Sequence, residues 1–335
     1  MGTRIAINGF GRIGRLVLRA LCERKDVDLD IVAINDLTTP ATNVHLFKYD
    51  SVHGPISHDM RLEDTTLHLN GHKIAMLSLP KPSELPWNDL GVDIVLECSG
   101  RFTKKEEAAA HLSAGAKQVL ISAPATGVDA TVVYGVNHHV LSDKTLVVSN
   151  ASCTTNCLAP VAQVLHKTLG IEKGFMTTIH AFTGDQRLVD TGHSDLRRSR
   201  AASLSMIPTS TGAARAVGLV LPELSGKIDG AAVRVPTSNV SFVDFKFLSR
   251  TPTTVEAVNN ALKTAAEGPL AGILRYEDQP LVSADFNHDA HSSIVDALET
   301  QVIGGNFVRV AAWYDNEWGF SNRMLDTAAA MAKHL

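Results

Sequence analysis

Short apolar runs alternate with helical patterns in the first half of the chain. Residues 4–9 (RIAING) and residues 30–36 (DIVAIND) form apolar strand patterns on either side of GFGRIGRLVLRALCER, which has helical spacing. Further strands are expected in VDIVLECSG, KQVLISAP, ATVVYGVN and TLVVSNAS, with a helix through KKEEAAAHLSAG. Buried strands that alternate with helical or looped connections predict an α/β domain with a doubly wound, largely parallel sheet.

The pattern changes near residue 150. Longer strands are expected in GFMTTIHAF, AAVRVPTSNVSFVDFKFL and FVRVAAWYD, with one clear helix in TVEAVNNALKTAAEG. These segments predict a second, α+β domain with a mixed or antiparallel sheet. We therefore expect a first domain over residues 1–150 and a second over residues 151–318. The C-terminal helix, residues 319–335, is expected to pack back on the first domain.

Composition narrows the possible functions of the 335-residue chain. A net charge of −4, with 20% charged residues, gives no electrostatic support for binding nucleic acid. Four cysteines are too few for a disulfide framework and lack the paired spacing of a zinc site, so no metal is expected and a reducing, cytoplasmic compartment fits. No apolar run approaches the 18 residues of a membrane span. Chemistry on small molecules is the expectation.

A glycine motif lies between the first strand and the first helix. Gly9, Gly11 and Gly14 form a GxGxxG pattern, and Asp36 ends the next strand. The glycines permit a tight turn, a close approach of the backbone to a pyrophosphate, and packing of the helix on the strand, while Asp36 would bind ribose hydroxyls and repel a 2′-phosphate. A tight strand-to-helix turn without a ligand is the alternative. The context of strand, helix and acid favours NAD bound to a Rossmann-type domain.

Cys153 lies in a cluster of small polar residues, SNASCTTNCLAP, where the chain turns apolar. Ser, Thr and Asn side chains favour a helix start, and unpaired N–H groups at the positive end of a helix favour a thiolate. Cys153 is therefore a candidate nucleophile, although a small buried residue at a helix cap is the other interpretation. His180, in GFMTTIHAFTGDQ, could serve as the base, or be a structural histidine of a strand.

Two further segments could bind anions. Arg234 lies in an apolar strand, AAVRVPT, where it could bind a substrate anion or form a structural ion pair. Thr211 and Gly212 lie at an expected helix start, which could bind an anion or simply be capped. A cysteine beside a nicotinamide cofactor suits aldehyde oxidation, because a thiolate adds to the carbonyl and the resulting hemithioacetal loses hydride to leave a thioester.

The chain resembles the phosphorylating glyceraldehyde-3-phosphate dehydrogenases, and this resemblance extends over the whole sequence. The motifs are AINGFGRIGR, SNASCTTNCLAP, TIHAFTGDQ, DLRRSRAA, STGAARAVG, RVPT and WYDNEWGFSNRMLD, of which ASCTTNC is the most specific. The resemblance implies that Cys153 is the nucleophile and that His180 activates it and assists hydride transfer. Inorganic phosphate then attacks the thioester, so that glyceraldehyde 3-phosphate becomes 1,3-bisphosphoglycerate, a step of glycolysis and gluconeogenesis.

The same resemblance implies the remaining site residues. Arg234 and Thr183 would hold the C3 phosphate of the substrate. The attacking phosphate would be bound by Ser152, Thr154, Thr211 and Gly212. Besides Asp36 and the three glycines, the residues implied for NAD are Arg12 and Ile13 at the pyrophosphate, Ser122 on the adenosine side and Asn316 at the nicotinamide carboxamide.

Family members are usually homotetramers, in which the DLRRSRAA segment meets neighbouring subunits. Thr191 and Gly192 occupy positions where bacterial members that use only NAD often have Leu-Pro, so we expect weak use of NADP. Because Asp36 would repel the 2′-phosphate of NADP, we still expect a strong preference for NAD. Two alternatives remain. Erythrose-4-phosphate dehydrogenases share the Cys and His but usually lack the Thr-Gly of the attacking-phosphate site. A catalytically silent NAD-binding or RNA-binding protein would be expected to lose Cys153, His180 or Arg234.

Overall fold

The computed structural model describes residues 2–335, which form two compact units. The first unit contains residues 2–132, 138–151 and 321–335, and the second contains residues 133–137 and 152–320. Among the described residues, no helix has both the length and the apolar character needed to cross a membrane.

The first unit is built on a nine-stranded sheet with the order β3-β4-β5-β2-β1-β6-β7-β9-β8. Its strands are β1 (Thr3–Asn8), β2 (Leu29–Asn35), β3 (Met60–Glu63), β4 (Thr66–Leu69), β5 (His72–Leu77), β6 (Ile94–Glu97), β7 (Gln118–Ile121), β8 (Ala130–Thr131) and β9 (Val147–Ser149). From β5 to β8 all neighbours are parallel, and β3 and β4 add an antiparallel edge. The predicted doubly wound parallel sheet is confirmed. Its strand order reverses at β1, where ligands bind in such sheets.

The helices of the first unit are α1 (Arg12–Glu23), α2 (Pro40–Lys48), α3 (Lys105–Ala108), α4 (Ala110–Ser113) and the part of α8 (Trp318–Ala332) that follows Phe320. Two 3₁₀ turns, η1 (Pro82–Glu84) and η2 (His138–Val140), also belong to it. The helix predicted through residues 104–115 is two short helices. The strand predicted over residues 130–137 is only two residues long, because the Asn137 side chain accepts the N–H of Val133 and turns the chain.

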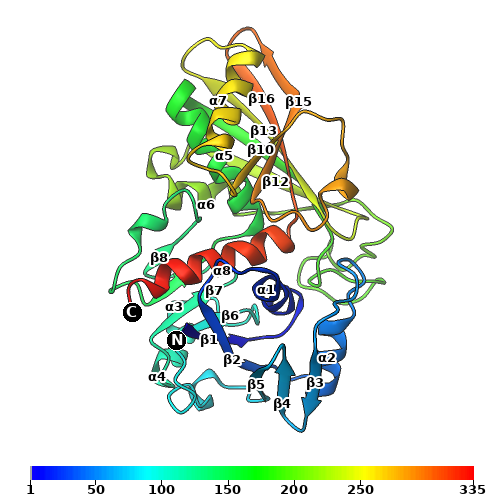
Figure 1. Ribbon diagram of the computed structural model, residues 1–335. Helices are drawn as coiled ribbons and strands as arrows, with labels where there is room; N and C mark the ends of the chain where they lie inside the picture. The colour runs from blue at the N-terminus through cyan, green and yellow to red at the C-terminus, as the bar shows by residue number, and fades with distance from the viewer. Residues whose placement is uncertain (1) are drawn as a thin grey trace. The chain divides into compact units, whose positions relative to one another are not determined.

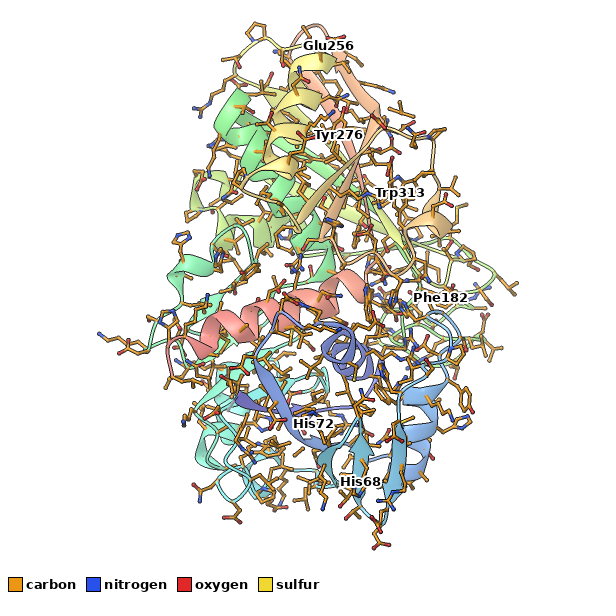
Figure 2. All side chains as sticks on the ribbon, viewed as in Figure 1. His68, His72, Phe182, Glu256, Tyr276 and Trp313 are labelled. Atoms are coloured by element: carbon orange, nitrogen blue, oxygen red, sulfur yellow. The ribbon has the colours of Figure 1, made fainter. Side chains whose placement is uncertain are left out.

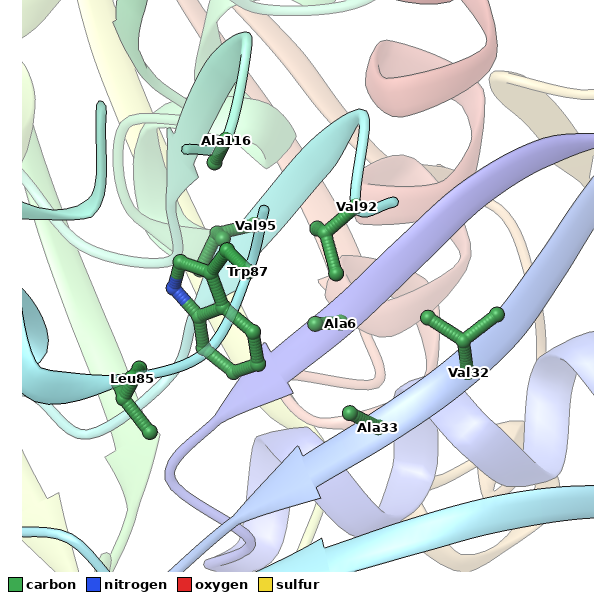
Figure 3. Close-up of a cluster of buried hydrophobic side chains, with 8 residues drawn as sticks. All are labelled: Ala6, Val32, Ala33, Leu85, Trp87, Val92, Val95 and Ala116. Atoms are coloured by element: carbon green, nitrogen blue, oxygen red, sulfur yellow. The ribbon is translucent and has the colours of Figure 1, made fainter. Parts of the chain in front are cut away.

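Trp87 is the centre of a buried apolar cluster in this unit, shown in Figure 3. The cluster is formed by Ala6, Val32, Ala33, Leu85, Trp87, Val92, Val95 and Ala116. Small residues on β1 and β2 leave room for the indole ring against the sheet, as interlocking packing requires. The segment between β5 and β6 is thereby anchored on the sheet.

The second unit is built on a seven-stranded mixed sheet with the order β11-β12-β10-β13-β16-β15-β14, which confirms the sequence-based prediction. Its strands are β10 (Ile171–Ala181), β11 (Ile207–Thr209), β12 (Ile228–Val235), β13 (Ser241–Ser249), β14 (Leu274–Glu277), β15 (Ser293–Ile303) and β16 (Phe307–Tyr314). The pairs β10–β12 and β14–β15 are parallel and the others antiparallel. The long strand predicted over residues 231–248 is two strands, because a turn that includes Pro236 separates β12 from β13.

Three helices, α5 (Cys153–Leu169), α6 (Ala213–Val220) and α7 (Val255–Glu267), cover one face of this sheet (Figure 1). Short 3₁₀ turns form at η3 (Pro222–Leu224) and η4 (Ser283–Phe286). Trp313, labelled in Figure 2, stacks on Phe286 with ring centroids 5.5 Å apart and packs against Phe242. The next residue, Tyr314, points the other way because side chains alternate along a strand. It therefore faces the start of α5.

Candidate active site

Cys153 is the first residue of α5. The Ser152 hydroxyl caps the helix by accepting the N–H of Thr155 at 3.0 Å, so the predicted helix start is confirmed. Burial raises the pKa of the Cys153 thiol, while the charge of Arg234 and the hydroxyl and N–H of Thr154 lower it less strongly. The donors of the helix start lower the pKa of the thiol, as predicted, but burial has the larger and opposite effect. Desolvation outweighs the local donors, and the sulfur holds its proton.

His180 lies beside this sulfur, near the end of β10. Its Nε2 is 3.5 Å from the Cys153 Sγ, and its ring meets Tyr314 edge-on at 5.9 Å. His180 is only 4% exposed, and burial, together with the charge of Arg234, lowers its pKa to about 3. The imidazole is thus neutral at physiological pH. A neutral ring next to a protonated thiol can accept the proton when the sulfur attacks a carbonyl.

Arg234 lies opposite His180 in the parallel pair of β10 and β12. Its Nη1 is 2.6 Å from the His180 Nδ1 and 3.0 Å from the carbonyl oxygen of Ala181. Among the described residues Arg234 has no ion pair with a carboxylate, and its buried Nε has no hydrogen-bond partner. This arrangement argues against a structural ion pair. A half-buried guanidinium without a carboxylate suits an anionic ligand.

Thr183 follows β10 and is half-buried. Its N–H donates to the Gln186 Oε1 at 3.2 Å, and the N–H of Gln186 donates back to the Thr183 carbonyl at 2.9 Å. The turn that carries Thr183 directly after the His180 strand is thus closed by Gln186. Sequence reasoning did not single out Gln186, and its position in TGDQ, three residues after Thr183, is the signal for such a turn.

Thr211 and Gly212 stand at the start of α6, as predicted. The Thr211 hydroxyl accepts the N–H of Ala213 at 3.1 Å, and Gly212 is the N-cap. The Thr155 hydroxyl donates to the Ala213 carbonyl at 3.2 Å, so the first turns of α5 and α6 are tied together. Two helix N-termini in one place form an environment that attracts anions.

Thr154 differs from the other residues expected at the attacking phosphate. It is buried, and its hydroxyl lies 2.8 Å from the Tyr314 Oη, which is also 2.9 Å from the Thr178 hydroxyl. Burial raises the pKa of Tyr314 well above its usual value, so the phenol stays protonated in this chain of hydroxyls. Tyr314 is a residue that sequence reasoning missed. It holds the helix start of Cys153 against the sheet of His180.

Asn316 follows β16 and is buried. Its Oδ1 accepts the hydroxyl of Ser241 at 2.8 Å. The carboxyl group of the preceding Asp315 accepts four donors, namely the N–H groups of His288, Glu317 and Trp318 and the Asn239 amide. The backbone around Asn316 is therefore rigidly held.

Candidate cofactor site

A cavity of about 280 Å³ lies in the first unit at the carboxyl ends of β1, β2 and β6. Gly9, Gly11 and Asp36 are among its lining residues, together with Leu79 and Ser99. Gly9 has φ +93°, and a Cβ there would lie 2.4 Å from the backbone nitrogen of Ser99. At Gly14 a Cβ would lie 2.2 Å from the Gly9 carbonyl oxygen. Both positions therefore exclude any side chain, as the dinucleotide motif requires.

Asp36 presents a fixed carboxylate to this cavity. Its two oxygens accept the N–H groups of Phe10 at 2.7 Å and Thr38 at 2.8 Å. Partial burial opposes its ionisation, but these N–H donors lower the pKa of Asp36 below its usual value. The carboxylate remains charged and keeps further lone pairs for ribose hydroxyls.

Three other residues expected at the cofactor, Arg12, Ile13 and Ser122, are not among the residues that line this cavity. Arg12 and Ile13 form the first turn of α1, whose N–H groups point out of the helix, and the Arg12 guanidinium pairs with Asp50. Partial burial opposes ionisation of Asp50, but the N–H of His53 and the Arg12 side chain lower its pKa to about 2. Ser122 directly follows β7 and is not among the residues that line the cavity.

A buried polar network underlies the cavity. The Trp87 indole N–H donates to the His111 Nδ1 at 2.9 Å, so the His111 Nε2 carries the proton and donates to Glu97 at 2.9 Å. Glu97 also accepts the N–H of Ser99 at 2.8 Å and the amide of Asn8. Sequence reasoning missed this network, although a Glu at the end of a buried strand, as in VDIVLECSG, is unusual. It fixes the loop that approaches Gly9.

These features define an NAD-dependent dehydrogenase: a doubly wound sheet with a glycine turn and a ribose-binding acid, and a separate unit with a cysteine beside a histidine. Two family models match the chain. Residues 3–105 match "Glyceraldehyde 3-phosphate dehydrogenase, NAD binding domain", and residues 152–316 match "Glyceraldehyde 3-phosphate dehydrogenase, C-terminal domain". The chain belongs to the glyceraldehyde-3-phosphate dehydrogenase family, as the motifs indicated, and its cofactor is NAD.

Individual relatives are similar in sequence to this chain over nearly their whole length. The chain is 60% identical over 333 residues to glyceraldehyde-3-phosphate dehydrogenase of Xanthobacter flavus, with 99% of each chain covered. It is 58% identical to that of Cereibacter sphaeroides over the full length of both chains. It is 55% identical to that of Geobacillus stearothermophilus, again with 99% of each covered. The similarity therefore includes both units.

Proposed function

We propose that the protein oxidises glyceraldehyde 3-phosphate with NAD and inorganic phosphate and releases 1,3-bisphosphoglycerate. The observation that carries this proposal is the group formed by Cys153, His180 and Arg234. It combines a thiol 3.5 Å from a neutral imidazole with a guanidinium that has no carboxylate partner among residues 2–335. A nucleophile, a proton acceptor and an anion-binding group are what an aldehyde that carries a phosphate requires.

Addition of Cys153 to the aldehyde begins the reaction. The sulfur forms a bond to the carbonyl carbon, and its proton passes to the His180 Nε2. Because the pKa of the thiol is raised and that of His180 is lowered, the proton stays on sulfur until the carbonyl is attacked. NAD supplies the hydride acceptor that converts the resulting hemithioacetal to a thioester. His180 gives this proton to the carbonyl oxygen as the hemithioacetal forms, and it takes the proton back from the hydroxyl as the hydride leaves.

Inorganic phosphate then attacks the thioester carbon, and the carbon–sulfur bond breaks to release the acyl phosphate. We assign the attacking phosphate to the linked starts of α5 and α6, with Ser152, Thr154, Thr211 and Gly212. The Thr154 hydroxyl lies against Tyr314 and its backbone N–H interacts with the Cys153 sulfur, so an attacking phosphate would share that N–H with the sulfur. Arg234 and Thr183 bind the C3 phosphate of the substrate.

For the cofactor, we assign the pyrophosphate to the turn of Gly9, Gly11 and Gly14 and to the first turn of α1, with Arg12 and Ile13. Asp36 binds the ribose, Ser122 lies on the adenosine side, and Asn316 binds the nicotinamide carboxamide. The steric exclusion of side chains at Gly9 and Gly14 supports this assignment.

We further infer a cytoplasmic homotetramer. The segment between β10 and β11 exposes five large apolar side chains, which a monomer rarely presents together: Leu188, Val189, Leu196, Leu204 and Met206. A second copy of the chain is the partner that the family resemblance implies for this segment. Sedimentation of the purified protein at micromolar concentration tests the stoichiometry.

One assay tests the catalytic proposal. NADH formation is measured with glyceraldehyde 3-phosphate and with erythrose 4-phosphate, each with and without inorganic phosphate. We expect rapid turnover only with glyceraldehyde 3-phosphate and phosphate together. Faster turnover of erythrose 4-phosphate, independent of phosphate, would identify the other enzyme. Binding of NAD without turnover of either aldehyde would indicate a binding protein.

A further inference from the structure

Ser241, at the start of β13, lies between the strand of His180 and the strand that leads to Asn316. It pairs in register with Tyr314 of β16, and its neighbour Phe242 pairs with Ile179 of β10. Ser241 is 1% exposed. Its hydroxyl oxygen accepts the N–H of Ala181 at 3.0 Å and lies 2.8 Å from the Asn316 Oδ1.

The Ser241 hydroxyl and the Asn316 amide form one hydrogen bond, in which the hydroxyl is the donor. A hydroxyl has one hydrogen to donate, and the N–H of Ala181 already occupies one of its acceptor positions. In this bond Ser241 donates to the oxygen of the Asn316 amide. The Asn316 Nδ2 is therefore held on the side away from Ser241, where it can only donate.

The rest of Asn316 has little freedom. Asp315 accepts its four donors from three segments of the second unit, so the backbone is fixed immediately before Asn316. Rotation about the side-chain bonds is the remaining freedom. The Ser241 hydroxyl is the group that removes it.

We propose that Ser241 is a positioning residue for hydride transfer, which presents the Asn316 Nδ2 to the carboxamide oxygen of the nicotinamide and thereby selects one face of the ring. This inference rests on the proposed function, in which Asn316 binds the nicotinamide. It adds a link to the proton acceptor, because the backbone of Ala181 donates to Ser241 and also offers its carbonyl to His180 and Arg234. The backbone of Ala181, a residue of β10, therefore connects the side chains that orient the nicotinamide ring with the histidine that accepts the proton.

The test compares Ser241→Ala with a matched control, Ser249→Ala. Ser249 lies on the same strand, is 2% exposed, and donates its hydroxyl to the Thr251 carbonyl at 2.8 Å. Ser241→Ala loses the bond accepted from Ala181 and the bond donated to Asn316, and Ser249→Ala loses a hydroxyl whose hydrogen is shared between the Thr251 and Asn306 carbonyls. Only Ser241→Ala is expected to lower kcat, by about tenfold for one lost orienting bond.

Isotope transfer reads the orientation directly. An aldehyde deuterated at C1 is oxidised, and the face of the nicotinamide that carries deuterium is determined by NMR. We expect a single face in the unmodified enzyme and in Ser249→Ala, and deuterium on both faces in Ser241→Ala. One face in Ser241→Ala, together with a kcat equal to that of Ser249→Ala, would overturn the proposal.

A double variant separates positioning from a general structural effect. If Ser241 acts through Asn316, Ser241→Ala should weaken calorimetric NAD binding in the unmodified background and cause no further loss in Asn316→Ala. Multiplicative losses would refute action through Asn316. The binding cycle needs no turnover. Failure of the unmodified enzyme to oxidise the aldehyde phosphate would count against the proposed function, whereas the binding cycle judges the role of Ser241.

Discussion

Replacing Arg234 by leucine tests whether its guanidinium binds the substrate phosphate. In the described part of the chain, Arg234 contacts His180 and the Ala181 carbonyl and has no carboxylate partner, so a phosphate has only these two contacts to displace. Two charged hydrogen bonds to a phosphate are worth about 1.5–3 kcal/mol each, and the one displaced hydrogen bond, to the Ala181 carbonyl, costs about 1 kcal/mol. The net loss is about 2–5 kcal/mol, or roughly a 30- to 5,000-fold fall in kcat/KM.

The assay compares glyceraldehyde 3-phosphate with unphosphorylated glyceraldehyde. Loss of the Arg234 charge also removes an influence that lowers the pKa of Cys153, and this effect is common to both substrates. We expect the full fall for the phosphorylated aldehyde and less than about a tenfold fall for glyceraldehyde. Arg234→Lys, which keeps the charge but loses the fork of donors, should be intermediate. An equal fall for both aldehydes would show that Arg234 serves the catalytic pair and not the phosphate.

Four further predictions follow from the other site residues. Asp36→Ala should narrow the preference for NAD by improving the kcat/KM for NADP; parity of the two cofactors before mutation would contradict its role. Thr211→Ala should raise the KM for inorganic phosphate more than that for the aldehyde, the reverse of Arg234→Leu. Because the pKa of His180 is lowered to about 3, its neutral form stabilises the fold above about pH 6.5, and this contribution is lost as pH falls toward 3. His180→Asn should therefore lose less stability between pH 7 and pH 5 in urea titrations, and alkylation of its Cys153 should shift to higher pH. His111→Phe should lower the melting temperature, at a cost of about 3–5 kcal/mol for breaking a buried network, and raise the KM for NAD with little change in kcat.

Local patterns were enough to locate most of the site along the chain. The cap formed by Ser152, the start of α6 at Gly212 and the turn at Gly9 each depend on residues within a few positions of one another. Capping and turn formation are short-range effects, so the residue types report them directly. The alternation of strands and helices likewise predicted both sheets.

Partners far apart in sequence were decided by the tertiary structure. Arg234 meets His180 across 54 residues, and Tyr314 meets Thr154 across 160 residues. Periodicity identifies a buried strand but does not say which strand lies beside it. The register of β10 with β12, and the link from Ser241 to Asn316, therefore follow only from the folded sheet.

The protonation state of Cys153 illustrates the same division. The sequence by itself determined that the sulfur stands at a helix start, where nearby donors lower its pKa, and the structure contains those donors at Thr154. Only the tertiary structure decided how deeply the sulfur is buried, and burial raises the pKa by more than the donors lower it. Helix-end effects act within one turn, whereas desolvation depends on every segment packed around the group.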